Sequence, residues 1–224
     1  MISTRHLDGL PDPVTLKRLC QSLAVLDAIL SSEWQYRYYS FNAKWTPNEQ
    51  LASMRNGSGD EYSLLFTPAG TIMKGFDHES SMTSYRHDPP KPWPRVLDHV
   101  PAVFAGFLAE PAFMIADVSF CLWRAMSDDR WRIGPIDFPD GPPDPDGSAH
   151  LLSILDGDPR TYVTFAEEYF GDEAPASLSF PLDLIERIYR HEPLTEEIVA
   201  GLNPVIGLAD VREDVADIGY PVAR

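Results

Sequence analysis

Carboxylates and one imidazole gather at both ends of a short segment in the first half of the chain. Asp60 stands directly before this segment, and Asp77, His78 and Glu79 follow it. A carboxylate beside an imidazole can help to hold a divalent metal ion, or it can orient the imidazole as a general base. These four residues are therefore the candidate catalytic residues of a metal-assisted hydrolase, with Asp60, Asp77 and His78 as the metal ligands. The alternative is an acidic, solvated strand end in which His78 simply pairs with Asp60.

The segment between these residues is typical of a β-hairpin. Apolar residues flank the turn sequence TPAG at 67–70, in which proline at the second position and glycine at the fourth favour a type I turn. The expected register places Thr71 opposite the first turn residue and Asp60 opposite His78. A period of two residues then places Lys74 on the same face as Asp60 and His78. The hairpin is the element that would bring the candidate residues together.

A second set of candidate residues consists of acids in the C-terminal half. The chain has 34 Asp and Glu against 18 Lys and Arg, a formal charge of −16. Residues 1–112 hold 12 acids and 10 bases, and residues 113–224 hold 22 acids and 8 bases. A field of this sign attracts a basic protein partner and speeds the encounter, unless the charge serves only solubility. The predicted partner-binding residues are Asp140, Asp144, Asp146, Asp156, Asp158, Glu167 and Glu168.

Other chemistry-bearing motifs are missing from the sequence. It holds no P-loop, dinucleotide-binding glycine turn, Gly-x-Ser-x-Gly elbow, His-Glu-x-x-His or Cys-x-x-Cys motif. Cys20 and Cys121 lie in apolar patterns typical of buried thiols, so no disulfide is expected. We therefore expect no cofactor, and an enzyme is the second of two functional hypotheses.

The charge and the hydropathy also disfavour classes of partner. Nucleic-acid and anionic-membrane binders need a basic face, and the net charge here has the opposite sign. No run approaches the roughly 18 apolar residues of a membrane span, and the first residues lack the apolar stretch of a secretion signal. We expect a cytoplasmic protein that binds neither nucleic acid nor membranes. The sequence predicts no particular oligomeric state.

The elements that must position these residues follow from the spacing of apolar side chains. Three- and four-residue spacing predicts helices, and alternation or aromatic density predicts strands. The expected helices are Thr15–Leu30, Pro47–Met54, Val96–Leu108, Thr161–Phe170, Leu182–Tyr189, Thr195–Leu202 and a short turn over Asp210–Asp217. The expected strands are Trp34–Phe41, the two arms of the hairpin over Glu61–Phe76, and Val118–Ala125 paired with Trp131–Ile133.

The order of these elements predicts an α+β fold, because hairpins occur without the alternation of strand and helix that a parallel sheet needs. We expect a mainly antiparallel sheet with hairpins, flanked by helices, and a helical C-terminal region. The expected domains are an α+β core over residues 1–174 and a helical C-terminal extension over residues 175–224 that packs on it.

The aromatic segment over residues 34–41 allows two interpretations. As a strand it would place Trp34, Tyr36 and Tyr38 on one face and Tyr39 and Phe41 on the other. Large aromatic side chains usually belong to the core, yet Trp and Tyr also dominate the hot spots of protein interfaces. The segment is thus either a central strand covered on both faces or a strand with one recognition face.

Four short motifs carry a resemblance to a known class of proteins. They are Arg55–Tyr62 (RNGSGDEY), Phe76–Ser80 (FDHES), Asp144–Gly147 (DPDG) and Leu155–Pro159 (LDGDP). Together with the size, the acidity and the aromatic α+β character, they make residues 30–170 resemble small acidic bacterial proteins, including immunity proteins of polymorphic toxin systems. The resemblance implies neutralisation of a toxin by binding, and it assigns no binding residue. Our first functional hypothesis is accordingly a non-enzymatic binding protein, an immunity-type inhibitor that covers a basic toxin or enzyme with its acidic C-terminal half.

Overall fold

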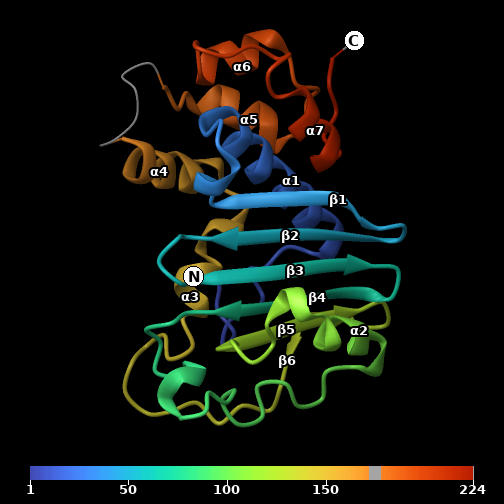
Figure 1. Ribbon diagram of the computed structural model, residues 1–224, viewed down its shortest axis with the longest axis vertical. Coiled ribbons are helices and arrows are strands. Elements are labelled where there is room, and N and C mark those ends of the chain that lie inside the picture. Colours follow the sequence, from blue (N-terminus) through green and yellow to red (C-terminus); the bar gives the residue numbers. More distant parts are fainter. Residues whose placement is uncertain (172–177, 224) are drawn as a thin grey trace.

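An antiparallel sheet forms the centre of the molecule. The computed structural model describes residues 1–171 and 178–223. The six strands lie in chain order, so each pairs with the next along the sequence (Figure 1). They are β1 (Tyr39–Thr46), β2 (Glu49–Arg55), β3 (Glu61–Thr67), β4 (Gly70–Phe76), β5 (Phe120–Ala125) and β6 (Arg132–Ile133). The predicted α+β fold with an antiparallel sheet is confirmed.

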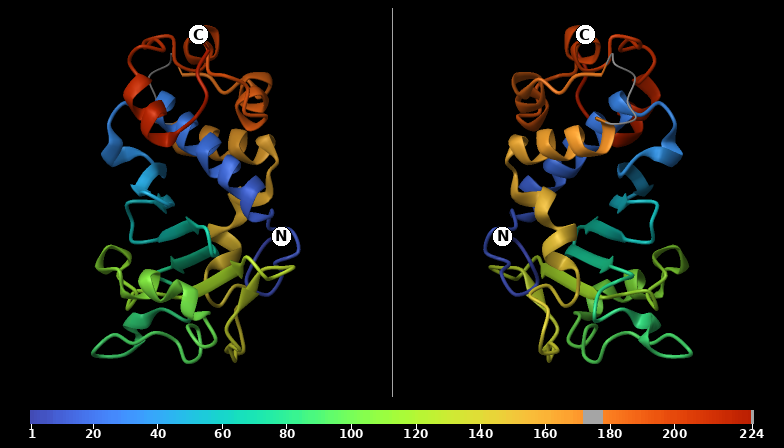
Figure 2. Two further views of the ribbon diagram at one scale, coloured as in Figure 1. Left: turned by 90° about the vertical axis from the view of Figure 1, so that its right-hand side faces the viewer. Right: turned by 90° about the vertical axis from the view of Figure 1, so that its left-hand side faces the viewer.

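Most of the helices lie at the β1 end of the sheet (Figure 1). The helices are α1 (Pro13–Leu30), α2 (Ala105–Ala109), α3 (Ser148–Leu151), α4 (Pro159–Phe170), α5 (Leu182–Tyr189), α6 (Glu196–Leu202) and α7 (Arg212–Ile218). Helix α1 begins after Asp12, whose side chain accepts hydrogen bonds from the Val14 and Thr15 amides and so caps the helix. In Figure 2, α1 and α3 lie on one side of the sheet and α2 lies on the other.

Two apolar clusters cover the two faces of the sheet. Along β4, Met73 belongs to the larger cluster, which includes the buried face of α1. Its neighbour Ile72 belongs to the smaller cluster, with Phe104 and Phe107. Successive side chains of a strand point to opposite faces, so this alternation buries β4 on both sides. The larger cluster also contains Ile185 of α5, and the C-terminal helices therefore share a core with the sheet.

Helices α5, α6 and α7 form the predicted helical C-terminal region. All three pack against α1, and α5 also packs against α4. The expected domain boundary between residues 174 and 175 lies outside the described residues. Among the helices of these two ranges, none is both long and apolar enough to cross a membrane.

One predicted helix is wrong in type. The segment Pro47–Met54 does not form a helix, because Pro47 and Asn48 make the turn between β1 and β2, and β2 follows at once. Ala52 and Met54 are buried whereas the intervening residue is half-buried, which is the period of a strand. The helix-start signal of a proline was therefore outweighed by the pairing of this segment with both neighbouring strands.

The aromatic segment is only partly a strand. Trp34–Tyr36 forms a 3₁₀ turn, and strand β1 begins at Tyr39. Tyr39 and Phe41 are buried, whereas Trp34 and Tyr36 are each 59% exposed. Because β1 is the edge of the sheet, a central strand covered on both faces is the wrong interpretation. The prediction of core burial is confirmed only for Tyr39 and Phe41.

The segment Val96–Leu108 is helical only in its second half. A 3₁₀ turn over Ala102–Phe104 runs into α2, while His99 has a positive φ of 65° and Pro101 lacks an amide donor. These two residues delay the start of the helix. The other predicted helices are confirmed to within a few residues, and β5 pairs with β6 as expected.

The hairpin over β3 and β4 is confirmed, but its register is shifted by one residue. Thr67 pairs with Gly70, which leaves a two-residue turn. A side chain at Gly70 would lie 2.4 Å from the Arg124 carbonyl oxygen, so glycine is needed here for the close approach of β5. A shift by one residue moves a side chain to the other face. Lys74 accordingly does not share a face with Asp60: it is fully buried, and its Nζ donates to Glu61 Oε1 and the Asp117 carbonyl oxygen, both at 2.7 Å.

Candidate functional site

The acidic residues predicted around the hairpin meet at one end of the central strands. Strand β3 begins and strand β4 ends there (Figure 1), which brings Asp60 and Asp77 together. With Glu79, Asp144 and His150 they line a hollow of about 390 Å³. We call this site the acidic hollow; its lining is Asp60, Asp77, Glu79, Ser80, Ser81, Pro142, Asp144 and His150.

Asp60 and His78 form the predicted pair in spite of the shifted register. Asp60 Oδ1 accepts hydrogen bonds from the His78 amide at 2.9 Å and lies 2.7 Å from His78 Nδ1. Asp60 Oδ2 accepts from Asn56 Nδ2 at 2.6 Å. Burial opposes ionisation of Asp60, but the bonds from His78 and Asn56 outweigh it and hold the pKa of this carboxyl below its ordinary value. The same bond, with the charges of the three neighbouring acids, raises the pKa of His78.

Asp77 is held against the loop that precedes α3. Its amide donates to Ser119 Oγ at 3.1 Å, and Ser119 Oγ donates to the Asp146 carbonyl oxygen at 2.7 Å. A side chain at Gly147 would lie 2.2 Å from Asp77 Cβ, so the loop can approach only because this residue is a glycine. Burial, and then the charge of Asp60, raise the pKa of Asp77.

Asp60, Asp77 and His78, the predicted metal ligands, lie close together. Each offers one ligand atom, and the three atoms lie within 4.8 Å of one another. Over residues 1–171 and 178–223, this is the one such group of three or more histidine, cysteine or carboxylate ligands. Glu79 lines the same hollow but does not belong to the group.

Two of the predicted partner-binding carboxylates, Asp144 and Asp146, differ in their exposure. Asp144 lines the acidic hollow and accepts hydrogen bonds from the Ala149 and His150 amides at the start of α3, both at 3.0 Å. Asp146 is 1% exposed and accepts hydrogen bonds from Thr4 Oγ1 and from the amide and hydroxyl of Ser148. Asp146 is therefore held inside the fold by these bonds and, unlike the other predicted partner-binding residues, offers almost no surface to a partner.

The other predicted carboxylates lie near the surface, two of them on α4 and the rest before it. Asp158 caps this helix by accepting from the Arg160 amide, and Asp156 accepts from Thr161 Oγ1. Glu167 and Glu168, in its last turns, are exposed, as is Asp140 in the loop before the acidic hollow.

A second hollow, which the sequence did not predict, lies between the sheet and α4. Its volume is about 600 Å³, and its aromatic wall consists of Tyr38, Phe165 and Tyr169. We call it the aromatic cleft; its lining is Tyr38, Tyr39, Met54, Asn56, His150, Leu151, Ser153, Ile154, Thr161, Thr164, Phe165, Glu168 and Tyr169. The only local signal was the excess of aromatic side chains on one amphipathic helix.

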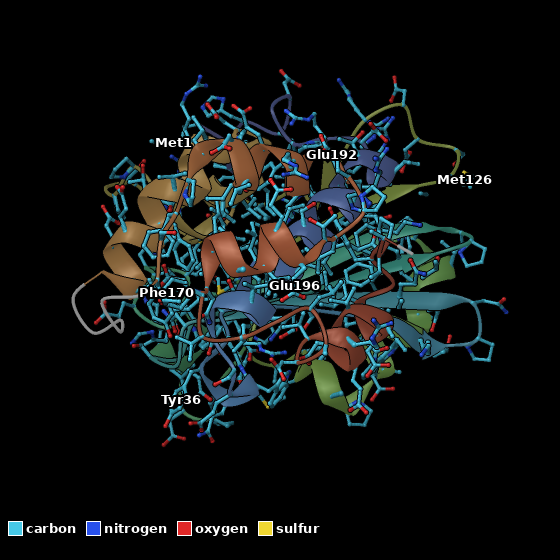
Figure 3. All side chains as sticks on the ribbon, turned by 90° about the horizontal axis from the view of Figure 1, so that it is seen from above. Met1, Tyr36, Met126, Phe170, Glu192 and Glu196 are labelled. Atoms are coloured by element: carbon cyan, nitrogen blue, oxygen red, sulfur yellow. The ribbon has the colours of Figure 1, made fainter. Side chains whose placement is uncertain are left out.

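The 3₁₀ turn Trp34–Tyr36 adds exposed aromatic surface at the periphery of the molecule. The Arg55 guanidinium lies 3.7 Å from the centroid of the Trp34 ring, a cation–π contact. The Tyr36 carbonyl oxygen accepts from the Tyr169 hydroxyl at 3.0 Å, which fixes the turn to α4. Figure 3 shows Tyr36 at the rim of the fold.

No family model, no curated protein and no solved structure matches the chain. The geometry of the two hollows is therefore the basis for a functional proposal.

Proposed function

We propose that the protein is a non-enzymatic, cytoplasmic binding protein, an immunity-type inhibitor that holds a basic toxin or enzyme at the acidic hollow. The observation that carries the proposal is the lining of this hollow, which contains Asp60, Asp77, Glu79 and Asp144 but no lysine or arginine. A guanidinium or ammonium group pairs with several carboxylates at once, and Arg is enriched among interface hot spots. The hollow is thus suited to one cationic side chain of a partner.

The electrostatics of Asp77 support a cationic occupant. The charge of Asp60 contributes to the raised pKa of Asp77, so the two carboxylates repel each other even though His78 pairs with Asp60. A positive charge between them would relieve this repulsion. Relief of this repulsion would contribute to the affinity for the partner.

The carboxylates on α4 and in the loop before α3 extend the negative surface beyond the hollow. Asp140, Asp156, Glu167 and Glu168 are exposed and so contribute to the long-range field. Such charges act mainly on the association rate, which they raise at low ionic strength. The proposal therefore separates a site that holds the partner from a surface that attracts it.

The experiment compares partner capture by the wild type and by a variant with a neutral hollow. The immobilised chain is exposed to a lysate of the source cells, and captured proteins are identified by mass spectrometry. The neutral variant is Asp77→Asn/Glu79→Gln/Asp144→Asn. We expect a basic protein that the wild type retains and the variant loses, and whose own activity falls when the chain is added at equal concentration.

A matched control separates the hollow from net charge. Asp98, Asp183 and Glu213 are exposed and line neither hollow, so Asp98→Asn/Asp183→Asn/Glu213→Gln removes three negative charges elsewhere. This control should retain the partner. Equal losses in both variants would show an unspecific charge effect, and the absence of any captured basic protein would contradict the proposal.

A second candidate function is a metal-assisted hydrolase, and the ligand group of Asp60, Asp77 and His78 favours it. These residues would hold the metal ion, which would supply an activated water at neutral pH. The test is thermal unfolding with Zn²⁺, Mn²⁺ and Mg²⁺. A ligand-bound protein melts higher by mass action, and the shift should weaken as pH falls through the histidine range and vanish in His78→Ala. The absence of a shift in the wild type would leave only the binding function.

A further inference from the structure

The aromatic cleft and the acidic hollow share a lining residue. His150 lines both of them. Asn56 lines the aromatic cleft, and its Nδ2 donates at 2.6 Å to Oδ2 of Asp60, a residue that lines the acidic hollow. The two hollows are therefore neighbouring parts of one surface, built from the strand ends on one side and from α3 and α4 on the other. A ligand that spans His150 contacts both of them.

The two hollows differ in chemistry. The wall of the aromatic cleft is a cluster of rings, with the centroid of Tyr38 5.1 Å from that of Phe165 and 4.5 Å from that of Tyr169, both in edge-on arrangements. Met54 and Ile154 add apolar surface. The lining of this cleft includes Glu168 and no lysine or arginine, so it disfavours an acidic group. Such a wall favours an aromatic side chain of the ligand, which can make edge-on contacts with these rings and a contact with the Met54 sulfur.

We infer that the partner presents a two-part element, an arginine or lysine for the acidic hollow and an aromatic residue close to it in sequence for the aromatic cleft. This inference rests on the proposed binding function and specifies its partner. In an extended segment, side chains two residues apart point the same way, about 7 Å from each other. One short extended strand of the partner can therefore fill both hollows. Charge complementarity sets its basic residue, and the ring cluster sets its aromatic one.

The test uses three synthetic peptides, which are acetyl-Arg-Ala-Phe-amide, acetyl-Arg-Ala-Ala-amide and acetyl-Ala-Ala-Phe-amide. Their dissociation constants are measured by amide chemical-shift titration of the whole chain. The first peptide should bind roughly tenfold more tightly than the second, because burial of a phenyl ring adds that much affinity even when it is incomplete. Shifts of residues around Phe165 should accompany the phenyl ring, and shifts around Asp77 should accompany the arginine.

Matched tryptophan variants separate the two parts. Thr164 is exposed and lines the aromatic cleft, so Thr164→Trp fills the cleft without removing core contacts. Thr164→Trp should abolish the gain from the phenyl ring and leave the arginine peptide unaffected. Val205 is exposed and lines neither hollow, so the control Val205→Trp should bind all three peptides like the wild type. Asp77→Asn/Glu79→Gln should weaken both arginine peptides alike.

The outcomes distinguish this inference from the proposed function. If both arginine peptides bind the wild type equally and lose affinity in Asp77→Asn/Glu79→Gln, the two-part element is wrong and the cationic site stands. If the arginine peptides bind no better than acetyl-Ala-Ala-Phe-amide, the cationic site itself is contradicted, and the two-part element with it. A phenyl-dependent gain that survives in Thr164→Trp would place the ring elsewhere and overturn the inference.

Discussion

Asp27 and Asp77 show two ways in which this fold treats a negative charge. Asp27 lies on α1 and is fully buried, yet both of its oxygens have fixed donors: the Tyr162 hydroxyl and the Tyr39 amide, each at 2.9 Å. It joins α1, β1 and α4. Asp77 lies in the acidic hollow, where its neighbours include three further carboxylates.

Burial raises the pKa of both carboxyls, but the other causes differ. For Asp27 burial raises the pKa from its ordinary value of 3.8 to about 7, and the bonds from Tyr39 and Tyr162 work against that rise. For Asp77 burial is followed by the charge of Asp60, which works in the same direction, while bonds from the Glu79 and Ser80 amides work against the rise. The donors of Asp27 thus join three elements of the fold, whereas those of Asp77 are local and a like charge stands beside it. We expect Asp27 to stabilise the fold and Asp77 to be available for binding.

Removal of Asp27 should cause the largest loss of stability. Asp27→Ala leaves the Tyr39 amide and the Tyr162 hydroxyl buried without a partner, which should lower the free energy of unfolding by about 3 kcal/mol at pH 6. Asp77→Ala should cost less than about 1 kcal/mol, because its site is open to solvent. Urea denaturation followed by circular dichroism measures both. Tyr162→Phe should give an intermediate loss, and equal losses for the two aspartates would remove the distinction between them.

The pH dependence of stability should also come largely from Asp27. Its pKa is raised to about 7 in the folded protein against an ordinary value of 3.8, so between these pH values the folded state holds a proton that the unfolded state has released. The free energy of unfolding therefore falls as pH rises through this window, by about 2 kcal/mol from pH 5 to pH 7. Asp27→Asn should lack this slope. Denaturation at half-unit pH steps compares the two proteins, and parallel curves would mean that Asp27 is ionised in both states.

The distribution of acids also shows what the sequence could predict. Asp60 and His78 meet as expected although the register was wrong by one residue, because both lie beyond the strand ends and turn toward each other there. The burial of Asp146 was not predicted, because it depends on Thr4, 142 positions away, and such a contact leaves no local pattern. Elements with a clear period, such as α1 and β5, were predicted well, whereas Pro47 mimicked a helix start.

The aromatic cleft shows the same limit for a binding surface. Tyr38 and Phe165 lie on different elements, and only the packing of α4 against the sheet brings their rings together. The sequence left open whether the aromatics between residues 34 and 41 belong to the core or to a recognition face, and it did not predict their contacts with α4. The acidic hollow could be predicted in part because a hairpin is local, and the cleft could not because it depends on tertiary contacts.

Asp146 belongs with Asp27, and its removal should therefore affect stability. Asp146→Ala removes the acceptor for Thr4 and Ser148, which ties the N-terminal segment to α3, and should cost about 1.5 kcal/mol. Asp140→Ala, at an exposed position of the same loop, should cost nothing measurable. Thermal unfolding of the two variants provides the comparison. A stable Asp146→Ala variant with impaired partner binding would return Asp146 to the binding residues.

The smallest effect should appear at His78, whose protonation reports on the acidic hollow without affecting the fold. The bond to Asp60 raises the pKa of His78, followed by the neighbouring charges, so Asp60→Asn should lower that pKa. The ion pair of His78 with Asp60 stabilises the fold while His78 is protonated, and this contribution is lost as pH rises through the folded-state pKa of His78. Because the His78 side chain is exposed, the free energy of unfolding should hardly change. Titration of the imidazole by NMR measures the shift. His191, whose pKa is lowered by burial beside α1, is the internal control and should not respond.

The same titration tests whether an arginine enters the acidic hollow. Because a bound cation disfavours the imidazolium, an arginine peptide in the acidic hollow should lower the pKa of His78 in the same way. An unchanged pKa at saturating peptide would place the arginine outside the hollow.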